Sequence, residues 1–455
     1  MSTINSKNVQ VGTSGTASQN FTLYQPATPD GTVRLGVGNS GATTLDAVTV
    51  TSAGNVTVSG SLAATTLSGA VTGGAVTATS LAVSGATTTS SLTVNNNAIS
   101  AVNSLEFRNR ILNGGMVIDQ RNVGASISFP SGDGAYCLDR WRLQRQGAGT
   151  MTVQRVTSTL AGFANALRFT VTGASTPSAS DYYTFGQIIE GFNTADLAWG
   201  TASAQSVTLS FWINSSVTGT YSASLFNWGG TGVNTYPATF TVNAANTWEY
   251  KTITIPGSTA GTWATTNAGS IYLRIDLGSG SNYNGTANAW NTSGGFRTSG
   301  SVNFISNASA TLNITGVQFE VGSVATPFER RDYGRELIMC QRYFEKSFDA
   351  NTAPAHNTGP FLIVPNGGSA GCGGNTYTTM FYKVSKRSSS TIRIYDPNGT
   401  AAPTTNAFRS FTACNSGSQS TSYFPDGQTT EFFAGTYQAA TSGSIAFLWT
   451  ADSEI

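Results

Sequence analysis

Apolar and polar residues alternate along most of the chain, with the two-residue period of strands that bury one face. From 106 to 330 these runs are separated by Gly- and Asn-rich segments, at the spacing expected of a β-sandwich. In one run Leu209, Phe211 and Ile213 share a face, and Trp212 lies on the other. The expected strands span residues 140–143, 151–156, 167–171, 207–213, 248–255, 271–275 and 312–317.

The period changes after Pro327. Apolar positions then fall at Tyr333, Leu337, Cys340 and Phe344, which are four, three and four residues apart and so share one helix face. This spacing predicts a helix over 329–346, with 331–346 as the connection between two β-domains. We hypothesise that three copies of this helix pack together in a trimer on Leu337, Cys340 and Phe344.

Short alternating runs return beyond the helix and predict a small C-terminal β-domain over 347–455. Turns are expected at 396–399 and 425–427, where Pro, Asn, Asp and Gly cluster. The expected strands span residues 361–364, 379–384, 391–395 and 445–449.

The N-terminal region, 1–45, contains strand-like runs at 20–24 and 32–37 around a turn at 26–31. A unit of this size makes a poor core alone, so we expect it to pack on copies of itself or on a partner.

Residues 46–105 carry no charge from Ala47 to Leu105 and repeat short apolar-Thr/Ser-apolar units ending in small residues. Strands with one apolar face must bury it. We therefore predict a fibrous β-shaft in which three parallel chains share an apolar axis, and a flexible Ser/Thr-rich linker is the alternative.

Composition narrows the function classes. The 23 basic and 22 acidic residues balance, which argues against nucleic-acid or anionic-membrane partners. The 4 cysteines form no CxxC pair, so we expect reduced structural thiols and neither a disulfide framework nor a metal site. The single histidine, His356, excludes His-cluster metal sites. No signal peptide, membrane-spanning run or cofactor motif is evident.

Catalysis is not expected, because the chain has no nucleophile elbow, phosphate-binding glycine loop or Cys/His pair. We expect Asp139 to make a structural ion pair with the neighbouring Arg140 or Arg142, and Asp276 is a candidate calcium ligand in a Gly-rich turn. The acids of the sandwich are scattered and include Asp133, Asp139, Asp181, Glu190, Asp196, Glu249 and Asp276.

Several ordered motifs resemble a carbohydrate-binding-module-like β-sandwich found in bacteriophage tail fibre and tail spike proteins. They cover about half of the chain, and the C-terminal VSKRSSSTIRIYDPNG (384–399) resembles the tips of related fibres. The sandwich motifs are NRILNGGM (109–116) with DQR (119–121), YCLDRW (136–141), FGQIIEG (185–191), TLSFWI (208–213), WEYKTITIPG (248–257) with GTW (261–263), VQFEVGSVATPFERR (317–331) and CQRYF (340–344).

The resemblance implies a mainly β, homotrimeric virion tail fibre with a jelly-roll sandwich over 106–330. It implies that the N-terminal unit binds a phage tail, baseplate or adaptor protein, and that the sandwich or tip binds a host-surface glycan without covalent chemistry. A spacer fibre without its own receptor site and a polysaccharide depolymerase are the alternatives.

Glycan binding requires aromatic rings for the C–H face of a sugar and amide or Arg donors for its hydroxyls. In the sandwich, Asn227, Asn234, Asn282 and Asn288 accompany the candidate rings Trp228, Tyr236, Tyr283 and Trp290. The candidates in the tip are Tyr377, Phe408, Arg409, Phe411 and Tyr423. The alternative is that these rings fill a core or subunit interface, where we place most of Trp141, Trp212, Trp248 and Trp263.

Overall fold

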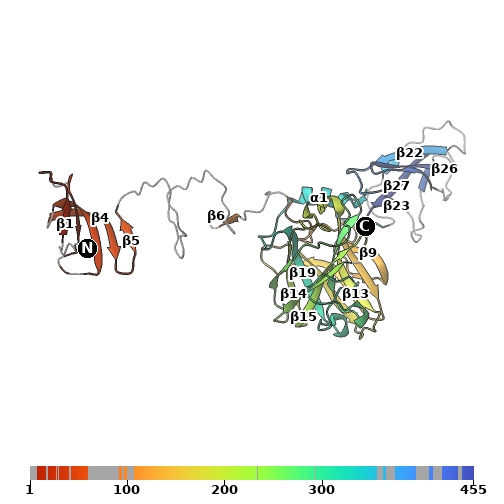
Figure 1. Cartoon of the computed structure of the whole chain (residues 1–455). Coiled ribbons are helices and arrows are strands. Elements are labelled where there is room, and N and C mark those ends of the chain that lie inside the picture. The colour runs from red at the N-terminus through yellow and green to blue at the C-terminus, as the bar shows by residue number, and fades with distance from the viewer. Residues whose placement is uncertain are drawn as a thin grey trace. The chain divides into compact units, whose positions relative to one another are not determined.

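The computed structural model (Figure 1) describes residues 8–16, 19–26, 28, 30–39, 42–59, 92–94, 97–99, 107–232, 234–292, 294–355, 362–364, 375–395, 409–412, 423–438 and 443–455. The chain forms two compact units, residues 1–87 and 88–455, and each is described by itself. Both units are mainly β.

The first unit is one antiparallel sheet, in which the strands follow one another in chain order. Its strands are β1 (Asn8–Val11), β2 (Phe21–Tyr24), β3 (Thr32–Asn39), β4 (Ala42–Thr51) and β5 (Val56–Val58). The boundary that we placed at residue 45 therefore falls inside β4, because β4 pairs with β3 over most of its length. Two runs assigned to the shaft, 48–51 and 56–59, belong to this sheet, and most of the shaft lies outside the described residues. Within it, β6 (Leu92–Val94) and β7 (Asn97–Ile99) pair antiparallel.

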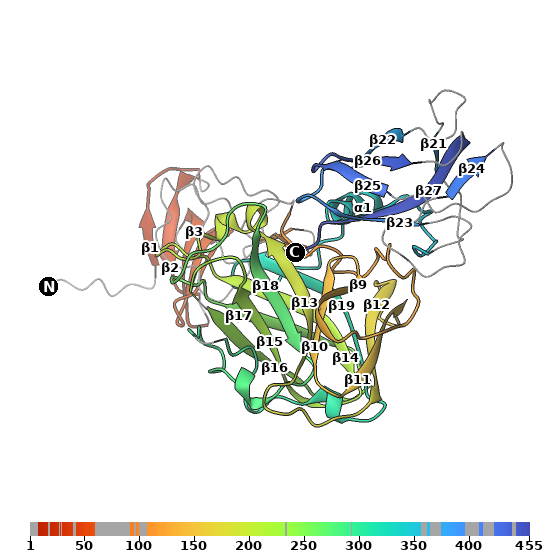
Figure 2. The same cartoon turned by 90° about the vertical axis from the view of Figure 1, so that its right-hand side faces the viewer.

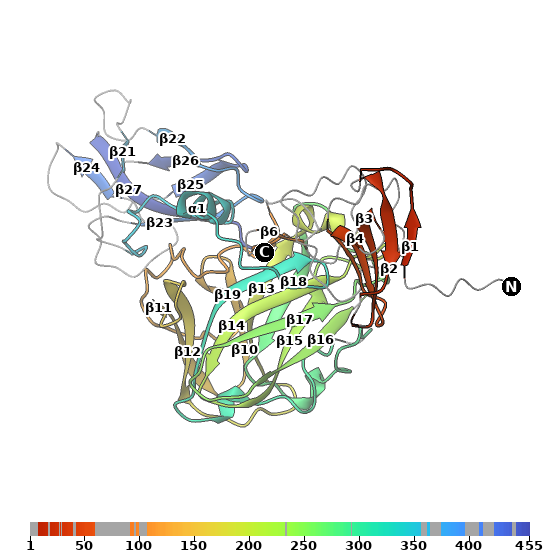
Figure 3. The same cartoon turned by 90° about the vertical axis from the view of Figure 1, so that its left-hand side faces the viewer.

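The largest part of the second unit is a sandwich of two six-stranded antiparallel sheets, which lie face to face (Figures 2 and 3). The first sheet has the order β16 (Thr235–Val242), β15 (Gly219–Asn227), β18 (Gly269–Asp276), β13 (Tyr182–Glu190), β10 (Trp141–Gln146) and β9 (Gly132–Leu138). The second has the order β17 (Glu249–Ile255), β14 (Val207–Ser215), β19 (Thr311–Val321), β12 (Asn165–Gly173), β11 (Thr150–Thr157) and β8 (Ile127–Ser128).

The apolar alternation fills the space between the two sheets. Leu209, Phe211 and Ile213 are fully buried, whereas Trp212 is partly exposed beside Tyr250, which confirms the faces predicted for this strand. The mainly β fold and every sandwich strand expected above are thus confirmed, with β8, β9, β13, β15 and β16 in addition.

Polar side chains at the end of β19 bind the segment that follows the strand. Glu320 accepts hydrogen bonds from the Thr326 amide at 2.8 Å and hydroxyl at 2.6 Å, and Gln318 accepts one from the Glu329 amide at 2.7 Å. These bonds hold the segment after β19 against the sheet. Both side chains are buried, so these hydrogen bonds also provide partners for polar atoms whose burial without a partner would destabilise the fold.

Helix α1 (Tyr333–Gln341) is shorter than predicted, and Asp332 caps it by accepting from the Arg335 amide at 3.0 Å. Phe344 lies in strand β20 (Phe344–Lys346), not on the helix. Cys340 and Phe344 are buried inside the same chain, and Leu337 is partly buried, so this face does not offer the trimer contact that we hypothesised. The spacing of the apolar residues correctly indicated a buried helix face. It could not show whether the same chain or another copy of the chain covers that face. Among the described residues, no helix is long and apolar enough to cross a membrane.

The C-terminal β-domain is built around its last strand. β27 (Gly443–Asp452) pairs with β20, β21 (Leu362–Val364), β23 (Thr391–Tyr395) and β24 (Arg409–Thr412). A separate sheet contains β22 (Asn375–Phe381), β26 (Phe432–Gln438) and β25 (Tyr423–Gln428). The turn expected at 425–427 is instead a register shift inside β25, and the turn at 396–399 lies outside the described residues.

Residues after β27 join this domain to the sandwich. Glu454 forms an ion pair with Arg140, and the two side chains are only 4% and 2% exposed. Glu454 also lies 3.3 Å from Arg121, whose guanidinium is 2.8 Å from Asp452 and stacks on Phe344 at 3.8 Å. The last residues of β27 thus fix the C-terminal domain on the β9–β10 side of the sandwich.

We expect Glu454→Ala to lower the free energy of unfolding by about 3 kcal/mol, because it leaves the buried Arg140 charge unpaired. Asp196→Asn is the control, since Asp196 is 54% exposed in its ion pair with Arg110 and should cost less than about 1 kcal/mol. Urea unfolding of the full chain, followed by Trp fluorescence, measures both. Equal losses for the two variants would contradict the anchoring role of Glu454.

Candidate functional site

An unusual set of polar and aromatic side chains lies on the outer face of the first sandwich sheet. In β18, Ile271, Leu273 and Ile275 point into the core, so Tyr272 and Arg274 point outward. Register places Arg142, Gly186, Arg274 and Ser224 in one row across β10, β13, β18 and β15. Two arginines therefore lie on either side of a glycine.

The side chain of Tyr272 crosses over Gly186, because its hydroxyl donates to the side-chain oxygen of Gln144 on β10 at 2.7 Å, and its buried ring lies between the two arginines. A Cβ atom on Gly186 would lie 1.8 Å from the Leu273 carbonyl oxygen, which is impossible without moving the backbone. The close approach of β13 and β18 therefore requires glycine here.

Aromatic rings stack on both guanidinium groups. Arg142 lies 4.7 Å from the centroid of Trp228 and 5.8 Å from that of Tyr272. Arg274 lies 5.1 Å from Tyr272, 5.1 Å from Phe226 and 4.3 Å from Phe296. Each such contact contributes about 0.5–2 kcal/mol, depending on how far water is excluded. We call this set, Arg142, Arg274, Phe226, Trp228, Tyr272 and Phe296, the arginine–aromatic face.

The two cations of this face have few polar partners. Among the described residues Arg274 forms no ion pair, and Arg142 donates to a terminal oxygen of the last residue, Ile455, at 3.3 Å. Their Nε atoms and the Ser224 hydroxyl are buried without a hydrogen-bond partner there. Burial lowers the pKa of Arg274 from its usual value, which expresses the cost of holding this charge away from water. The Nε atoms of Arg121, Arg140 and Arg297 also lack such a partner although these arginines form ion pairs, so the feature is not particular to this face.

Two segments border the face. Along β15 and β18, the segment 279–301 is held by the Thr298 amide, which donates to Ser222 at 3.1 Å, and by the Arg297–Asp276 ion pair at 3.2 Å. At the other end, the Ile455 main-chain oxygen accepts from Tyr136 at 2.7 Å. Between these borders Trp228 remains 36% exposed, and Phe226 and Arg274 are partly exposed.

Two of the predicted rings belong to this region. Trp228 is part of the arginine–aromatic face, and Tyr283 stacks on Phe296 at a centroid distance of 4.7 Å. Tyr182 continues the row, 5.5 Å from Tyr283. Trp228 and Tyr283 are thus connected through Arg142, Tyr272, Arg274 and Phe296.

The other two rings of the sandwich lie elsewhere. Tyr236 stands in β16 and is 4% exposed. It packs on Trp290 at 5.3 Å, and Trp290 lies 5.4 Å from Trp199 and donates to the Pro256 carbonyl at 2.9 Å. These rings close one end of the core. They therefore have the structural role that was the alternative to glycan binding. The accompanying Asn227 and Asn234 donate to the carbonyls of Thr262 and Ala260, which holds loops together.

The candidates of the C-terminal domain are located only in part. Tyr377 belongs to β22, Arg409 and Phe411 to β24, and Tyr423 to β25, but their side chains are outside the described structure. Phe408 lies outside the described residues altogether.

Asp139 and Asp276 have different partners in the structure from those expected from the sequence. Asp139 accepts from the amide and side chain of Gln120, at 2.7 and 2.6 Å, and burial raises its pKa to about 6. Arg140, its expected partner, pairs with Glu454 instead. Asp276 is bound by Arg297 rather than placed for calcium, and the described residues contain no group of three or more potential metal ligands.

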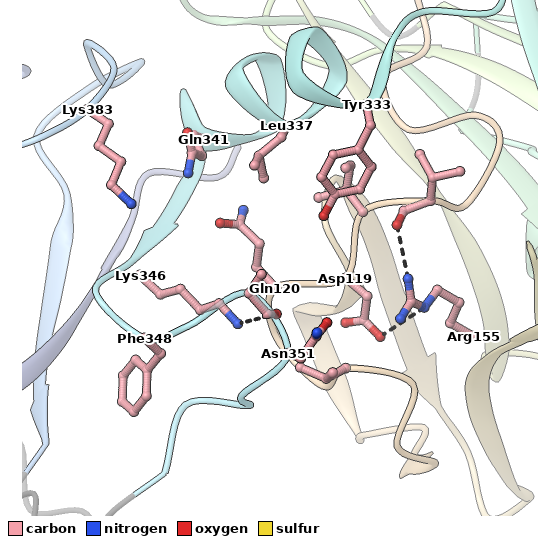
Figure 4. Close-up of a pocket in the computed structure, with 14 residues that line it drawn as sticks. Asp119, Gln120, Arg155, Tyr333, Leu337, Gln341, Lys346, Phe348, Asn351 and Lys383 are labelled. Carbon is pink, nitrogen blue, oxygen red and sulfur yellow. Dashed lines mark hydrogen bonds and ion pairs between the residues drawn. The ribbon is translucent and has the colours of Figure 1, made fainter. Parts of the chain in front are cut away.

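A pocket between α1, the sandwich and the C-terminal domain is a second candidate. Figure 4 shows Tyr333 and Leu337 of α1 opposite Asp119 and Gln120, with Lys346 reaching in from the side. Lys346 donates to the carbonyls of Ala350 and Thr352, at 3.1 and 2.7 Å. With a volume of about 120 Å³, the pocket is well below the roughly 300 Å³ of typical small-molecule sites. It is better explained as a junction between domains.

Sequence reasoning missed most of the arginine–aromatic face. Arg142, Tyr272 and Arg274 stand in strands that were predicted correctly, and the alternation places them opposite the core residues. The missing signal was their cross-strand register, which brings residues more than a hundred positions apart into one row.

The fold and face define an antiparallel β-sandwich protein with a cationic, ring-lined outer surface. Solved structures that it resembles include the enzymatically active domain of tailspike protein 4 from bacteriophage CBA120, at 15% identity and a TM-score of 0.26, covering 47% of this chain but only 21% of that one. A putative sugar binding protein from Bacteroides thetaiotaomicron is 13% identical, with a TM-score of 0.26, over 47% of this chain and 100% of that one. The family 11 carbohydrate-binding module of a Clostridium thermocellum cellulase is 12% identical, with a TM-score of 0.23, over 42% and 92%. No family model and no curated protein matches the chain.

The two ring groups should differ in what they contribute to stability. We expect Trp290→Ala to cost about 3 kcal/mol, since it removes a ring packed on three others and breaks a hydrogen bond. Trp228→Ala should cost about 1 kcal/mol, because that ring is more exposed and packs partly on a cation. Urea unfolding of the full chain measures both, and a larger loss for Trp228→Ala would mean that Trp228 is primarily structural.

Proposed function

We propose that this chain is a tail-fibre subunit of a bacteriophage virion and that its sandwich binds a host-surface carbohydrate on the arginine–aromatic face. One observation carries the carbohydrate proposal: the guanidinium groups of Arg142 and Arg274 alternate with aromatic rings, one of which, Trp228, is exposed. A sugar ring offers a C–H face that packs on an aromatic ring and hydroxyls that accept hydrogen bonds from guanidinium groups.

The contacts of the acidic residues on this face favour binding of a carbohydrate over cleavage of its glycosidic bonds. Glycoside hydrolysis uses two carboxyl groups roughly 5 to 9.5 Å apart on either side of the bond. On this face Asp276 is occupied by Arg297, and Asp133 accepts from the Tyr182 hydroxyl at 2.9 Å. We therefore propose a binding protein rather than a depolymerase.

The fibre role draws on the sequence motifs of 109–344 that resemble tail fibre and tail spike proteins. In this role the N-terminal unit would attach to the tail, and the second unit would present the sandwich to the host. Several weak sites on one virion would then bind together, and their avidity would exceed the affinity of any single site.

The N-terminal sheet supports self-association, which we propose to be trimeric. One apolar row crosses all five strands and consists of Val9, Leu23, Leu35, Val48 and Val58. Leu23 is 48% exposed and Val56, in the next row, is 62% exposed. The charged group formed by Arg34 and Asp46 is on the opposite face, so copies of the chain could cover this apolar face without burying a charge.

We expect Trp228→Ala and Tyr283→Ala each to weaken carbohydrate binding by about tenfold, because Trp228 is the exposed ring on Arg142 and Tyr283 supports Phe296, the ring on Arg274. Tyr250→Ala is the matched control, since Tyr250 is 42% exposed on the outer side of the second sheet. A glycan array followed by titration calorimetry on the full-length protein measures the effect. Unchanged binding in the first two variants would place the receptor site elsewhere.

We expect the full-length protein to sediment as a trimer, and Leu23→Asp to shift it toward the monomer because a charge then enters the apolar row. Thr57→Asp, which adds the same charge on the opposite face of the sheet, should leave the trimer unchanged. Analytical ultracentrifugation tests both variants. A monomeric parent protein would contradict the proposed assembly.

A further inference from the structure

A cleft lies between the edge of the sandwich and the C-terminal domain, outside the arginine–aromatic face. Its volume of about 320 Å³ falls within the roughly 300–1,000 Å³ of typical small-molecule sites, in contrast to the pocket next to α1. Such sites often form between domains. We call it the interdomain cleft, and the residues that line it include Arg121, Tyr136, Phe344, Arg393, Tyr395 and Asp452.

The alternation of two strands produces the polar wall of this cleft. In β23, Ile394 belongs to the core of the C-terminal domain and Ile392 packs on that core. Arg393 and Tyr395 therefore point to the opposite side of the sheet. Register pairs Arg393 with Thr450 of β27, so Asp452, two residues further along β27, lies on the same side. The two charged groups are thus diagonal neighbours across a pair of strands.

Arg121 connects the two domains at the cleft and fixes its shape. Its guanidinium group lies 3.8 Å from the centroid of the Phe344 ring and 5.1 Å from that of Tyr136. It also forms ion pairs with Asp452 at 2.8 Å and with Glu454 at 3.3 Å, and its side chain is 13% exposed. The walls of the cleft are therefore fixed by contacts within the chain, which lowers the cost of ordering them when a ligand binds.

The charges in the cleft favour a neutral ligand. Asp452 keeps 35% of its side chain exposed although it pairs with Arg121. Burial raises the pKa of Asp452, but Arg121 and, to a smaller degree, Arg393 lower it below its usual value overall, so the carboxyl group is ionised at neutral pH. A ligand with a charge of either sign would meet a like charge in the cleft, which opposes binding. A hydroxyl group can donate to the carboxylate and accept from the guanidinium group.

Tyr395 supplies an apolar surface beside these charged groups. Its ring is partly exposed and packs edge-on against Phe348 at a centroid distance of 5.2 Å, which fixes its orientation. The C–H face of a sugar packs on a ring of this kind, while the hydroxyls of the same sugar reach the neighbouring polar groups. Ring, cation and carboxylate together match the surface of a neutral sugar.

We propose that the interdomain cleft is a second carbohydrate-binding site, which takes a neutral mono- or disaccharide unit with its C–H face on Tyr395 and its hydroxyls between Arg393 and Asp452. The site requires both domains, because Tyr136 belongs to the sandwich and the other three residues to the C-terminal domain. It uses no residue of the arginine–aromatic face, so binding at the two sites can be measured separately.

The test uses the full-length protein and the methyl glycosides of glucose, galactose, mannose, rhamnose, N-acetylglucosamine and N-acetylgalactosamine. Glucuronic acid and glucosamine are the acidic and basic probes, and titrations followed by saturation-transfer NMR measure each affinity. We expect at least one neutral glycoside to bind at least tenfold more tightly than both charged probes. Tighter binding of a charged probe would overturn the neutral preference. Failure of every neutral glycoside to bind would overturn the second site, whereas glycan-array binding that depends on Trp228 would still support the arginine–aromatic face.

Variants then assign the binding to the cleft. We expect Arg393→Ala and Tyr395→Ala each to weaken binding of that glycoside by about tenfold, because one removes a donor to the sugar hydroxyls and the other removes the ring. Trp228→Ala should leave it unchanged. Phe381→Ala is the matched control, since Phe381 is 73% exposed on a separate sheet of the C-terminal domain. Unchanged binding in the two cleft variants, or weakening in Trp228→Ala alone, would overturn the assignment to the cleft.

Two further measurements separate loss of the site from loss of the fold. Because Arg393 is exposed, Arg393→Ala should leave the midpoint of thermal unfolding unchanged. Hydroxyl-radical footprinting of the parent protein should show Tyr395 protected by the bound glycoside and Trp228 as reactive as before. A strongly lowered midpoint in Arg393→Ala would indicate that Arg393 supports the fold instead, and protection of Trp228 without Tyr395 would contradict the proposed location.

Discussion

The buried ion pair between Arg140 and Glu454 determines how the second unit is put together. Arg140 belongs to the sandwich, and Glu454 follows β27, the strand on which much of the C-terminal domain is built. A charge in either place would be costly alone, so the two domains are stable only when they bring these residues together. The next residue, Ile455, then contacts Tyr136 and Arg142 and forms one border of the arginine–aromatic face. Domain docking and the candidate site are therefore built by the same few residues.

The sandwich uses aromatic residues for two different purposes. One group of rings closes the core, and its contacts stabilise the fold. It consists of Trp290, Trp263, Trp199 and Tyr236, which pack on one another. Trp228 instead packs on the guanidinium group of Arg142, outside the core, and remains 36% exposed. Cation–π contacts of this kind offset part of the cost of holding Arg142 and Arg274 away from water.

The sequence was sufficient to predict the β-strands, because a two-residue period survives wherever one face is buried. It also identified Trp228 and Tyr283, which lie in the region of the candidate site. It could not show that Tyr236 and Trp290 fill the core, since an aromatic residue between glycines and asparagines looks the same in either role. The helix was predicted too long because Phe344 continues the helical spacing by chance while belonging to β20. Arg142 and Arg274 were missed because their proximity depends on strand order, which no local pattern contains.

Gly186 also bears on how such a surface can diverge. Because any Cβ atom there would collide with the Leu273 carbonyl, this position cannot carry a side chain of its own. Variation of the outer face must instead occur at outward positions such as 142 and 274, which lie outside the apolar core. The sheet therefore acts as a fixed frame on which the outward side chains can be exchanged without disturbing the core.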